Sequence, residues 1–291
     1  MPFTQVTFLA WILMLGVTFF TFVAARFYVR RHEMLSRFSI ASDVFLLLST
    51  VFVLAAICKM CYGLLHEFGV RRNHPEWEEW QIHNRIFTDS NDLALKFLYF
   101  LGLEYIVGLW CIKVAFVLFY WDMFSRTHGQ KRLALYATSF FIPATFAAVI
   151  VKFFTHCRPV AISWDLKLIV KHGKRCTPNS AKSVQWLLSG SNIITDLMCT
   201  PLSLVSCHSL KNLNLTKEPT TYAVAFVFLI GMISISATIV RIMYFHQTGV
   251  FQPGFHGGIT LQQHHNLELI SSIEVLAALI AFCLPAFRFL L

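Results

Sequence analysis

The stretch TFLAWILMLGVTFFTFVAA, residues 7–25, decides the fold class, because no charged side chain occurs in it. An α-helix needs about 20 mostly apolar residues to cross a hydrocarbon core of ~30 Å. Six more apolar stretches of similar length follow, separated by polar connections. We therefore predict an all-α membrane protein, a single domain over 1–291 made of a bundle of seven transmembrane helices. The predicted helices are 7–29, 44–65, 97–121, 133–156, 184–207, 221–246 and 266–290.

The composition agrees with a membrane protein. Hydrophobic residues make up 56% of the chain and charged residues 13%, about half the charged share of a soluble domain. Seven spans leave no room for a soluble catalytic or binding domain within 291 residues. The net charge of +9 is scattered over the connections, so we interpret it as topology determinants and lipid contacts and do not predict nucleic-acid binding. The lipid bilayer is the first predicted partner.

The orientation follows from the positive charges after the first span, at Arg26, Arg30, Arg31 and Arg37. They favour an extracytoplasmic N-terminus and, after seven crossings, a cytoplasmic C-terminus. The basic connection between the fourth and fifth spans argues the other way, but the first helix usually dominates. We predict a multi-pass protein of the plasma membrane or an endomembrane. The glycosylation sequon at Asn214 would then lie in the cytoplasm and stay unmodified.

Polar and ionisable residues at membrane depth are costly and normally face the interior of a bundle, where they find partners. Those predicted to form a buried polar network or a ligand site are Asp43, Lys59, Glu104, Lys113, Asn192, Asp196, Arg241 and Glu274. Polar or small residues at steps of three and four accompany them on the fifth, sixth and seventh predicted helices, which places each set on one face.

Depth along the helices then limits which charges can meet. At about 1.5 Å per residue, Lys59, Glu104, Arg241 and Glu274 share one layer in the outer half of the bundle. Within that layer we predict that Arg241 pairs with Glu274. Lys113 and Asp196 lie deeper and form a second predicted pair. The functional interpretation is a polar cavity that receives a ligand, and the structural one is a set of buried ion pairs that fixes helix packing.

Cys157 and Cys176 bracket the connection between the fourth and fifth spans, and their spacing alone fits a disulfide and two free thiols equally well. The histidines at 246, 256, 264 and 265 are interpreted as solvated loop residues, and no metal site is predicted. No cofactor is predicted either. Retinal is disfavoured because the seventh span has no lysine for a Schiff base.

Several segments together resemble one family of integral membrane proteins. Ser42-Asp43-Val-Phe-Leu-Leu47 is similar to the acidic start of the second helix in the fungal rhodopsin-domain family, of the satratoxin-cluster type that includes receptor-like Pth proteins. The order of the remaining similar segments is also that of the family: Lys113-Val-Ala-Phe-Val-Leu-Phe-Tyr120, Cys157-Arg-Pro159 with Trp164 and Cys176, Asn192-Ile-Ile-Thr-Asp196, Ile239-Val-Arg241, Ile273-Glu274 and Cys283-Leu-Pro285.

The resemblance implies a rhodopsin-like architecture and a disulfide between Cys157 and Cys176. It also implies that Lys113, Asp196, Arg241 and Glu274 are family features. Asp122 at the end of the third span departs from the arginine that relatives usually carry there. Receptor members often have a cysteine-rich extracellular N-terminal domain and a long cytoplasmic tail, and the loss of both argues against G-protein signalling.

Two functions compete on these grounds. The first is a receptor-like protein that binds a small lipophilic or amphipathic molecule in the outer half of the bundle, with a signalling protein as a possible partner at the cytoplasmic loops. The second is an integral membrane enzyme or accessory factor that acts on a lipophilic intermediate in a fungal secondary-metabolite pathway, with Glu104, Asp196 or Glu274 as proton donors. A transporter is disfavoured because neither inverted halves nor broken helices are evident.

Overall fold

Seven long α-helices and one short 3-10 helix occur in the part of the chain that the computed structural model describes, which is residues 5–31, 36–77, 81, 91–124, 130–165, 168, 176, 181–211, 219–247 and 261–287. The all-α prediction is confirmed. The elements in chain order are α1 (Gln5–Arg30), α2 (Arg37–Asn73), α4 (Asn91–Phe124), α5 (Gln130–His156), η2 (Val160–Ser163), α7 (Lys182–Lys211), α8 (Pro219–Gln247) and α9 (Leu261–Phe287).

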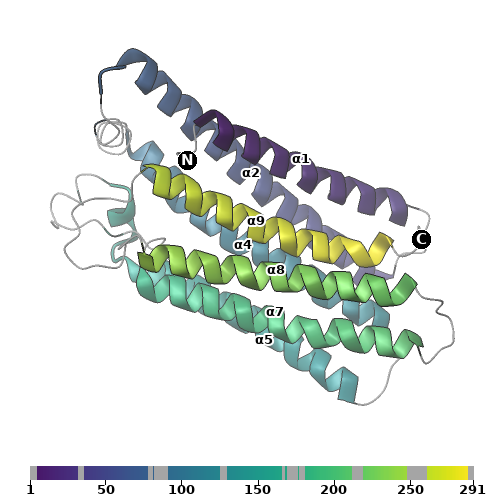
Figure 1. Ribbon diagram of the computed structural model, residues 1–291. Coiled ribbons are helices and arrows are strands. Elements are labelled where there is room, and N and C mark those ends of the chain that lie inside the picture. The colour runs from purple at the N-terminus through teal and green to yellow at the C-terminus, as the bar shows by residue number, and fades with distance from the viewer. Residues whose placement is uncertain are drawn as a thin grey trace.

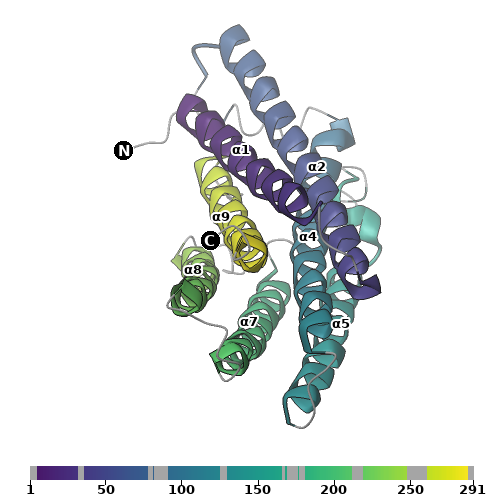
Figure 2. The same cartoon turned by 90° about the vertical axis from the view of Figure 1, so that its right-hand side faces the viewer.

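The helices form a ring in chain order. Each long helix packs against the next, and α9 closes the ring by packing against α1. Figure 2 shows this ring from one end, with α9 between α1 and α8. The ring has a central member, α4, which also contacts α9 and α7 across the bundle. Half of the apolar window of α4 is buried, the largest share among the candidate spans.

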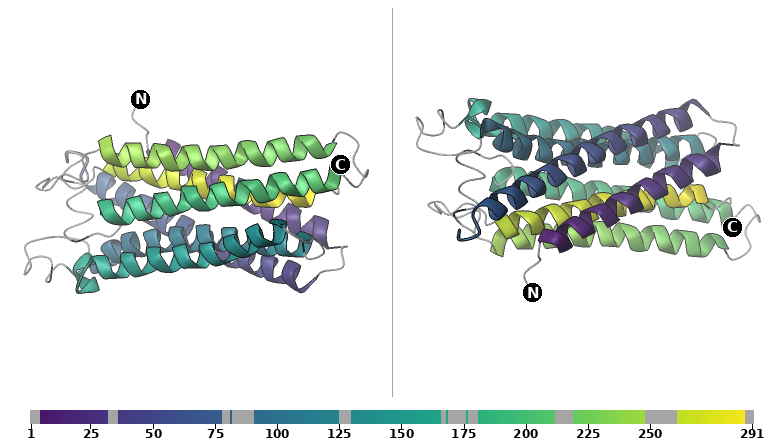
Figure 3. Two further views of the ribbon diagram at one scale, coloured as in Figure 1. Left: turned by 90° about the horizontal axis from the view of Figure 1, so that it is seen from below. Right: turned by 90° about the horizontal axis from the view of Figure 1, so that it is seen from above.

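The two ends of the bundle differ. The start of α1 and the short helix η2 lie at one end, and α9 finishes at the other (Figures 1 and 3). We call the first the disulfide end, because the Cys157–Cys176 bond lies there beside η2. Helices that follow one another in the chain run antiparallel, so α2, α5 and α8 finish at the disulfide end whereas α1, α4, α7 and α9 begin there.

Five helices in the described part of the chain contain a stretch that is long and apolar enough to cross a membrane: α1, α2, α4, α5 and α9. Large apolar side chains such as Val17, Leu65 and Phe140 are exposed on the outside of the bundle. Such a surface is stable in contact with lipid and not with water. The predicted contact with the bilayer is therefore confirmed.

The helix bounds correct the predicted second span. It was placed at 44–65, but α2 extends from Arg37 to Asn73. Ser36 caps its start, because the Ser36 hydroxyl accepts a hydrogen bond from the Ser39 amide at 3.2 Å. Apolar content marks only the part of a helix that fits the hydrocarbon core, so it misses polar turns that extend beyond this core. Glu67 accordingly lies buried on α2 and not in a polar connection.

Candidate functional site

A buried ion pair joins α8 to α9 toward the disulfide end. Arg241 Nη1 lies 3.0 Å from Glu274 Oε2, and both side chains are at most 2% exposed. The predicted pairing of these two residues is confirmed. The polar stripes place them there, because Ser234, Thr238 and Arg241 are buried on one face of α8, and Glu274, Ala278 and Ala281 are buried on one face of α9.

Glu274 is the acceptor at the centre of this cluster. Its Oε2 forms the ion pair with Arg241 and accepts a hydrogen bond from the Tyr105 hydroxyl at 2.6 Å. Its Oε1 accepts from the Asn192 amide and from the Thr238 hydroxyl. A carboxylate has about four lone-pair sites, so the donors of α4, α7 and α8 saturate Glu274.

Arg241 is held by the same neighbours. Its second terminal nitrogen donates to the Ser189 hydroxyl at 2.9 Å, and its first also donates to the Tyr105 hydroxyl. The guanidinium carbon lies 4.9 Å from the centre of the Tyr105 ring, within cation–π range. The pair therefore lies inside a hydrogen-bonded shell contributed by three helices, α4, α7 and α8.

A second cluster surrounds Lys113, as predicted from depth. Its ammonium nitrogen lies 2.6 Å from Asp196 Oδ1 and also donates to the Thr195 hydroxyl and to the Asn192 carbonyl oxygen, the last at 3.1 Å. The three N–H donors of the lysine thus each have an acceptor on α7. The Ser234 hydroxyl of α8 donates to the other Asp196 oxygen at 3.1 Å.

Asn192 belongs to both clusters. Its backbone carbonyl accepts from Lys113, and its side-chain amide donates to Glu274 and, at 2.9 Å, to Thr238. The Asn192 side chain is fully buried. One residue on α7 therefore connects the Lys113–Asp196 pair to the Arg241–Glu274 pair, and the result is a continuous polar network across α4, α7, α8 and α9.

A third ion pair, also toward the disulfide end, differs from the Arg241–Glu274 pair in exposure. Lys59 of α2 forms an ion pair with Glu104 of α4, and these side chains are 22% and 12% exposed. The layer of four charges predicted from depth therefore divides into two separate pairs, one enclosed and one open. Glu104 and Lys113 have different neighbours, because residues nine apart in a helix lie on opposite sides of it.

Asp43 forms ion pairs with two arginines to which the sequence analysis gave a different role. Arg26 and Arg30 of α1 were interpreted as topology determinants in contact with lipid, but both are buried. Arg30 lies 2.8 Å and Arg26 3.5 Å from Asp43 Oδ1. Arg26 also donates to the Phe282 carbonyl of α9 at 3.1 Å. Because these arginines stand one turn apart at the end of α1, they clamp α1 to α2 and α9 at the end opposite the disulfide.

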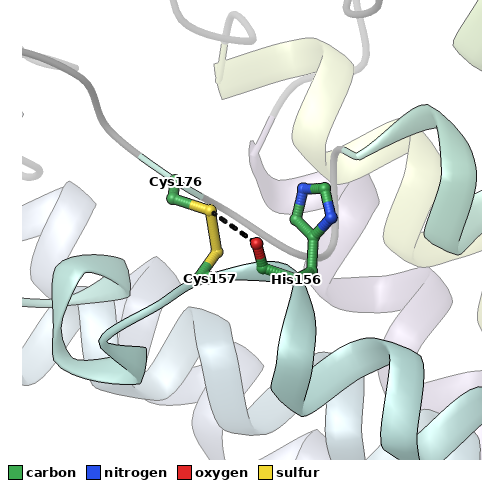
Figure 4. Close-up of a disulfide and its surroundings, with 3 residues drawn as sticks. All are labelled: His156, Cys157 and Cys176. Carbon is green, nitrogen blue, oxygen red and sulfur yellow. Dashed lines mark hydrogen bonds between the residues drawn. A yellow bond between two sulfur atoms is a disulfide. The ribbon is translucent and has the colours of Figure 1, made fainter.

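Cys157 and Cys176 form the disulfide that the family resemblance implied, and it joins the end of α5 to the connection before α7 (Figure 4). The Cys176 sulfur lies 3.9 Å from the His156 carbonyl oxygen, and this is a contact because a disulfide sulfur carries no proton. Potential ligand atoms of His156, Cys157 and Cys176 lie within 4.8 Å of one another. Both sulfurs are bonded to each other, so this group offers no thiolate to a metal ion.

A pair of cysteines and a group of histidines lie outside the network. Cys58 and Cys61 have the Cys-x-x-Cys spacing, which the sequence analysis did not use, on the partly exposed side of α2. Among the histidines near the sixth predicted connection, His246 is exposed at the end of α8. His256 and the sequon at Asn214 lie outside the described residues, as do the side chains of His264, His265 and Pro285.

The network includes residues that the pattern did not reveal. Tyr105 and Thr195 stand beside predicted site residues in the sequence, and the structure shows that they are donors or acceptors to the ion pairs. Their polar groups at membrane depth were the available signal. All three carboxylates considered as proton donors, Glu104, Asp196 and Glu274, are engaged by a basic side chain.

A comparison with family models finds a match over residues 25–291 to the model described as the fungal rhodopsin domain. No curated protein and no solved structure matches the chain. The matched residues include every member of the polar network, the disulfide and both partners of each ion pair described above.

Proposed function

Since the chain belongs to the fungal rhodopsin domain family, we propose that it works as a receptor-like multi-pass membrane protein that binds a small amphipathic molecule in the outer half of the bundle. The observation that carries the proposal is the continuous network through Asn192, which connects α4, α7, α8 and α9. A change at one pair alters the partners of the other, which is what a bistable element between two sites requires.

The proposed direction of transmission follows from the geometry of the network. A ligand near the disulfide end would shift α4 or α9 against α7 and α8. Because Glu274 and Lys113 both depend on Asn192 for a partner, the shift would reach the Lys113–Asp196 pair deeper in the bundle. A signalling protein at the opposite end would be the reader of that change.

The enzyme or accessory alternative in a secondary-metabolite pathway is less well supported, since the buried carboxylates are committed to ion pairs. One experiment separates the two. The protein in nanodiscs is incubated with an organic extract of the source organism, and the extract is then analysed by mass spectrometry. We expect one compound to be retained at about one molecule per protein, unchanged. Conversion of many molecules per protein would establish the enzyme. If no compound is retained and none is converted, the receptor proposal is wrong.

We expect Asn192→Leu to bind the retained compound but to lose transmission. Leucine has nearly the same size and keeps the backbone carbonyl that Lys113 uses, so only the side-chain links to Glu274 and Thr238 are broken. Hydrogen–deuterium exchange should show ligand-dependent protection at both ends of α7 in the wild type and only at the disulfide end in the variant. Protection at both ends of the variant would show that Asn192 transmits nothing.

We further propose that the disulfide end faces outward, so that the N-terminus is extracytoplasmic. Disulfides persist on the oxidising side of a membrane, and the start of α1 lies at the same end as the bond. We expect Asn214 to remain unglycosylated in a eukaryotic host, and a sequon engineered at Glu76 to be modified. The mobility shift after glycosidase treatment measures both. Modification of Asn214 together with an unmodified engineered site would show that the orientation is the reverse of the proposed one.

A further inference from the structure

The two ion pairs of the outer half differ in access. The Arg241–Glu274 pair is at most 2% exposed and its carboxylate is saturated by four donors. The Lys59–Glu104 pair lies where α2 packs against α4, and both side chains keep part of their surface exposed. A molecule that arrives from the bilayer can therefore reach this second pair without separating the helices of the central network.

The Lys59–Glu104 pair also has unused hydrogen-bonding capacity. Within the described part of the chain, the Lys59 ammonium hydrogen-bonds to Glu104 Oε1 alone, although it has three N–H donors. Glu104 Oε2 is buried and has no hydrogen-bond partner there. A buried acceptor without a partner is unfavourable. The pair thus presents one free acceptor and at least one free donor next to each other.

Aromatic rings continue the surface beside the pair. Phe97, Phe100 and Glu104 stand at steps of three and four on one face of α4. The Phe100 ring centre lies 5.7 Å from the Lys59 ammonium nitrogen, and the Tyr62 ring of α2 packs edge-on against Phe97 with centres 5.5 Å apart. Phe100 and Tyr62 are both exposed, so the rings offer an apolar face that leads to the ion pair.

We propose that the Lys59–Glu104 pair binds the hydroxyl group of a neutral lipophilic alcohol whose apolar body lies against Tyr62, Phe97 and Phe100. A hydroxyl both donates, here to Glu104 Oε2, and accepts, here from Lys59. A carboxylate or sulfate ligand would face the Glu104 charge, an amine would face the Lys59 charge, and a ketone has no proton for Glu104. The hydroxyl is also small enough to reach an oxygen below the surface. This inference rests on the proposed function and specifies the chemical class of its ligand.

The test compares one ring skeleton with different head groups. Cholesterol, the corresponding ketone and cholesterol sulfate are titrated into nanodiscs that contain the protein, and binding is measured by native mass spectrometry. We expect the wild type to bind the alcohol at least about tenfold more tightly than the ketone or the sulfate, because a site built to hydrogen-bond a hydroxyl rejects analogues without it. Equal binding of the three compounds would overturn the proposal.

Variants then locate the site. In the double variant Lys59→Met with Glu104→Met both charges are removed together at similar volume, so no unpaired charge remains and folding should survive, as a single peak in size-exclusion chromatography would verify. We expect it to bind alcohol and ketone equally. Glu76→Gln, an exposed carboxylate after α2, is the matched control and should keep the preference. A double variant that keeps the preference would overturn the proposal.

The extract experiment separates failure of this inference from failure of the proposed function. If the wild type and the double variant retain the same natural compound equally well, the receptor function stands and the assignment to Lys59 and Glu104 is wrong. If neither protein retains any compound, and the wild type binds cholesterol no more tightly than the ketone or the sulfate, both proposals fail.

Discussion

Replacing Glu274 by leucine should unfold the protein or abolish its accumulation in the membrane. The substitution leaves the Arg241 charge buried without a counter-ion and removes the acceptor of Tyr105, Asn192 and Thr238 at once. Breaking a buried pair on one side costs about 3–5 kcal/mol, a large fraction of the stability of a typical domain. The midpoint of thermal unfolding in detergent, followed by fluorescence-detected size-exclusion chromatography, measures the loss.

Three companion variants identify its cause. Glu274→Gln keeps an acceptor of nearly the same shape and should be milder. Arg241→Leu combined with Glu274→Leu removes the unpaired charge, but it leaves the Tyr105, Asn192 and Thr238 donors without their acceptor, so we expect only partial recovery. Glu104→Leu breaks a partly exposed pair that rests on one ion-pair partner and should cost less. Full recovery in the double variant would show that the charge alone matters and that the hydrogen-bonded shell contributes little.

Most of the fold could be predicted because bilayer thickness imposes a length on apolar segments. The long helices follow the predicted spans. The polar or small residues at helical spacing are all at least partly buried: Gly231, Ser234, Thr238 and Arg241 on α8, and Ser271, Glu274, Ala278 and Ala281 on α9. The helix ends could not be predicted in the same way. The turns of α2 beyond residue 65 are polar, so apolar content does not predict that they are helical.

Depth and helical period also predicted two ion pairs of the site, because a charge at membrane depth must find a partner in its own layer. The same reasoning failed at the end of the first span. Arg26 follows an uncharged stretch, as a topology-determining arginine does, and it is nevertheless fully buried against Asp43 and the Phe282 carbonyl. The sequence shows at which end of a helix a charge lies. It does not show which backbone segment from elsewhere in the chain packs against that charge. The closure of the ring by α9 against α1 supplies that information only in three dimensions.

Lys113→Met should be the second most damaging change, with a loss of about 3 kcal/mol or more. Methionine matches the length of the lysine stem but donates nothing. The Asn192 carbonyl, the Thr195 hydroxyl and Asp196 then all lose the same donor. The Ser234 hydroxyl still reaches Asp196, yet a neutral donor does not balance a carboxylate charge at this depth. Thermal unfolding in the same detergent measures the loss.

The position should also reject arginine, although the charge is conserved. A planar guanidinium cannot direct three N–H groups to acceptors grouped around one nitrogen atom, as an ammonium does. Lys59→Met is the matched control, since that ammonium is partly exposed and has one ion-pair partner, and its loss should be clearly smaller. Asp196→Asn combined with Lys113→Met removes the stranded charge and should restore part of the stability. If Lys113→Met and Lys59→Met were equally mild, the three-acceptor site around Lys113 would not be what connects α4 to α7. The network through Asn192 would then not extend to the Lys113–Asp196 pair.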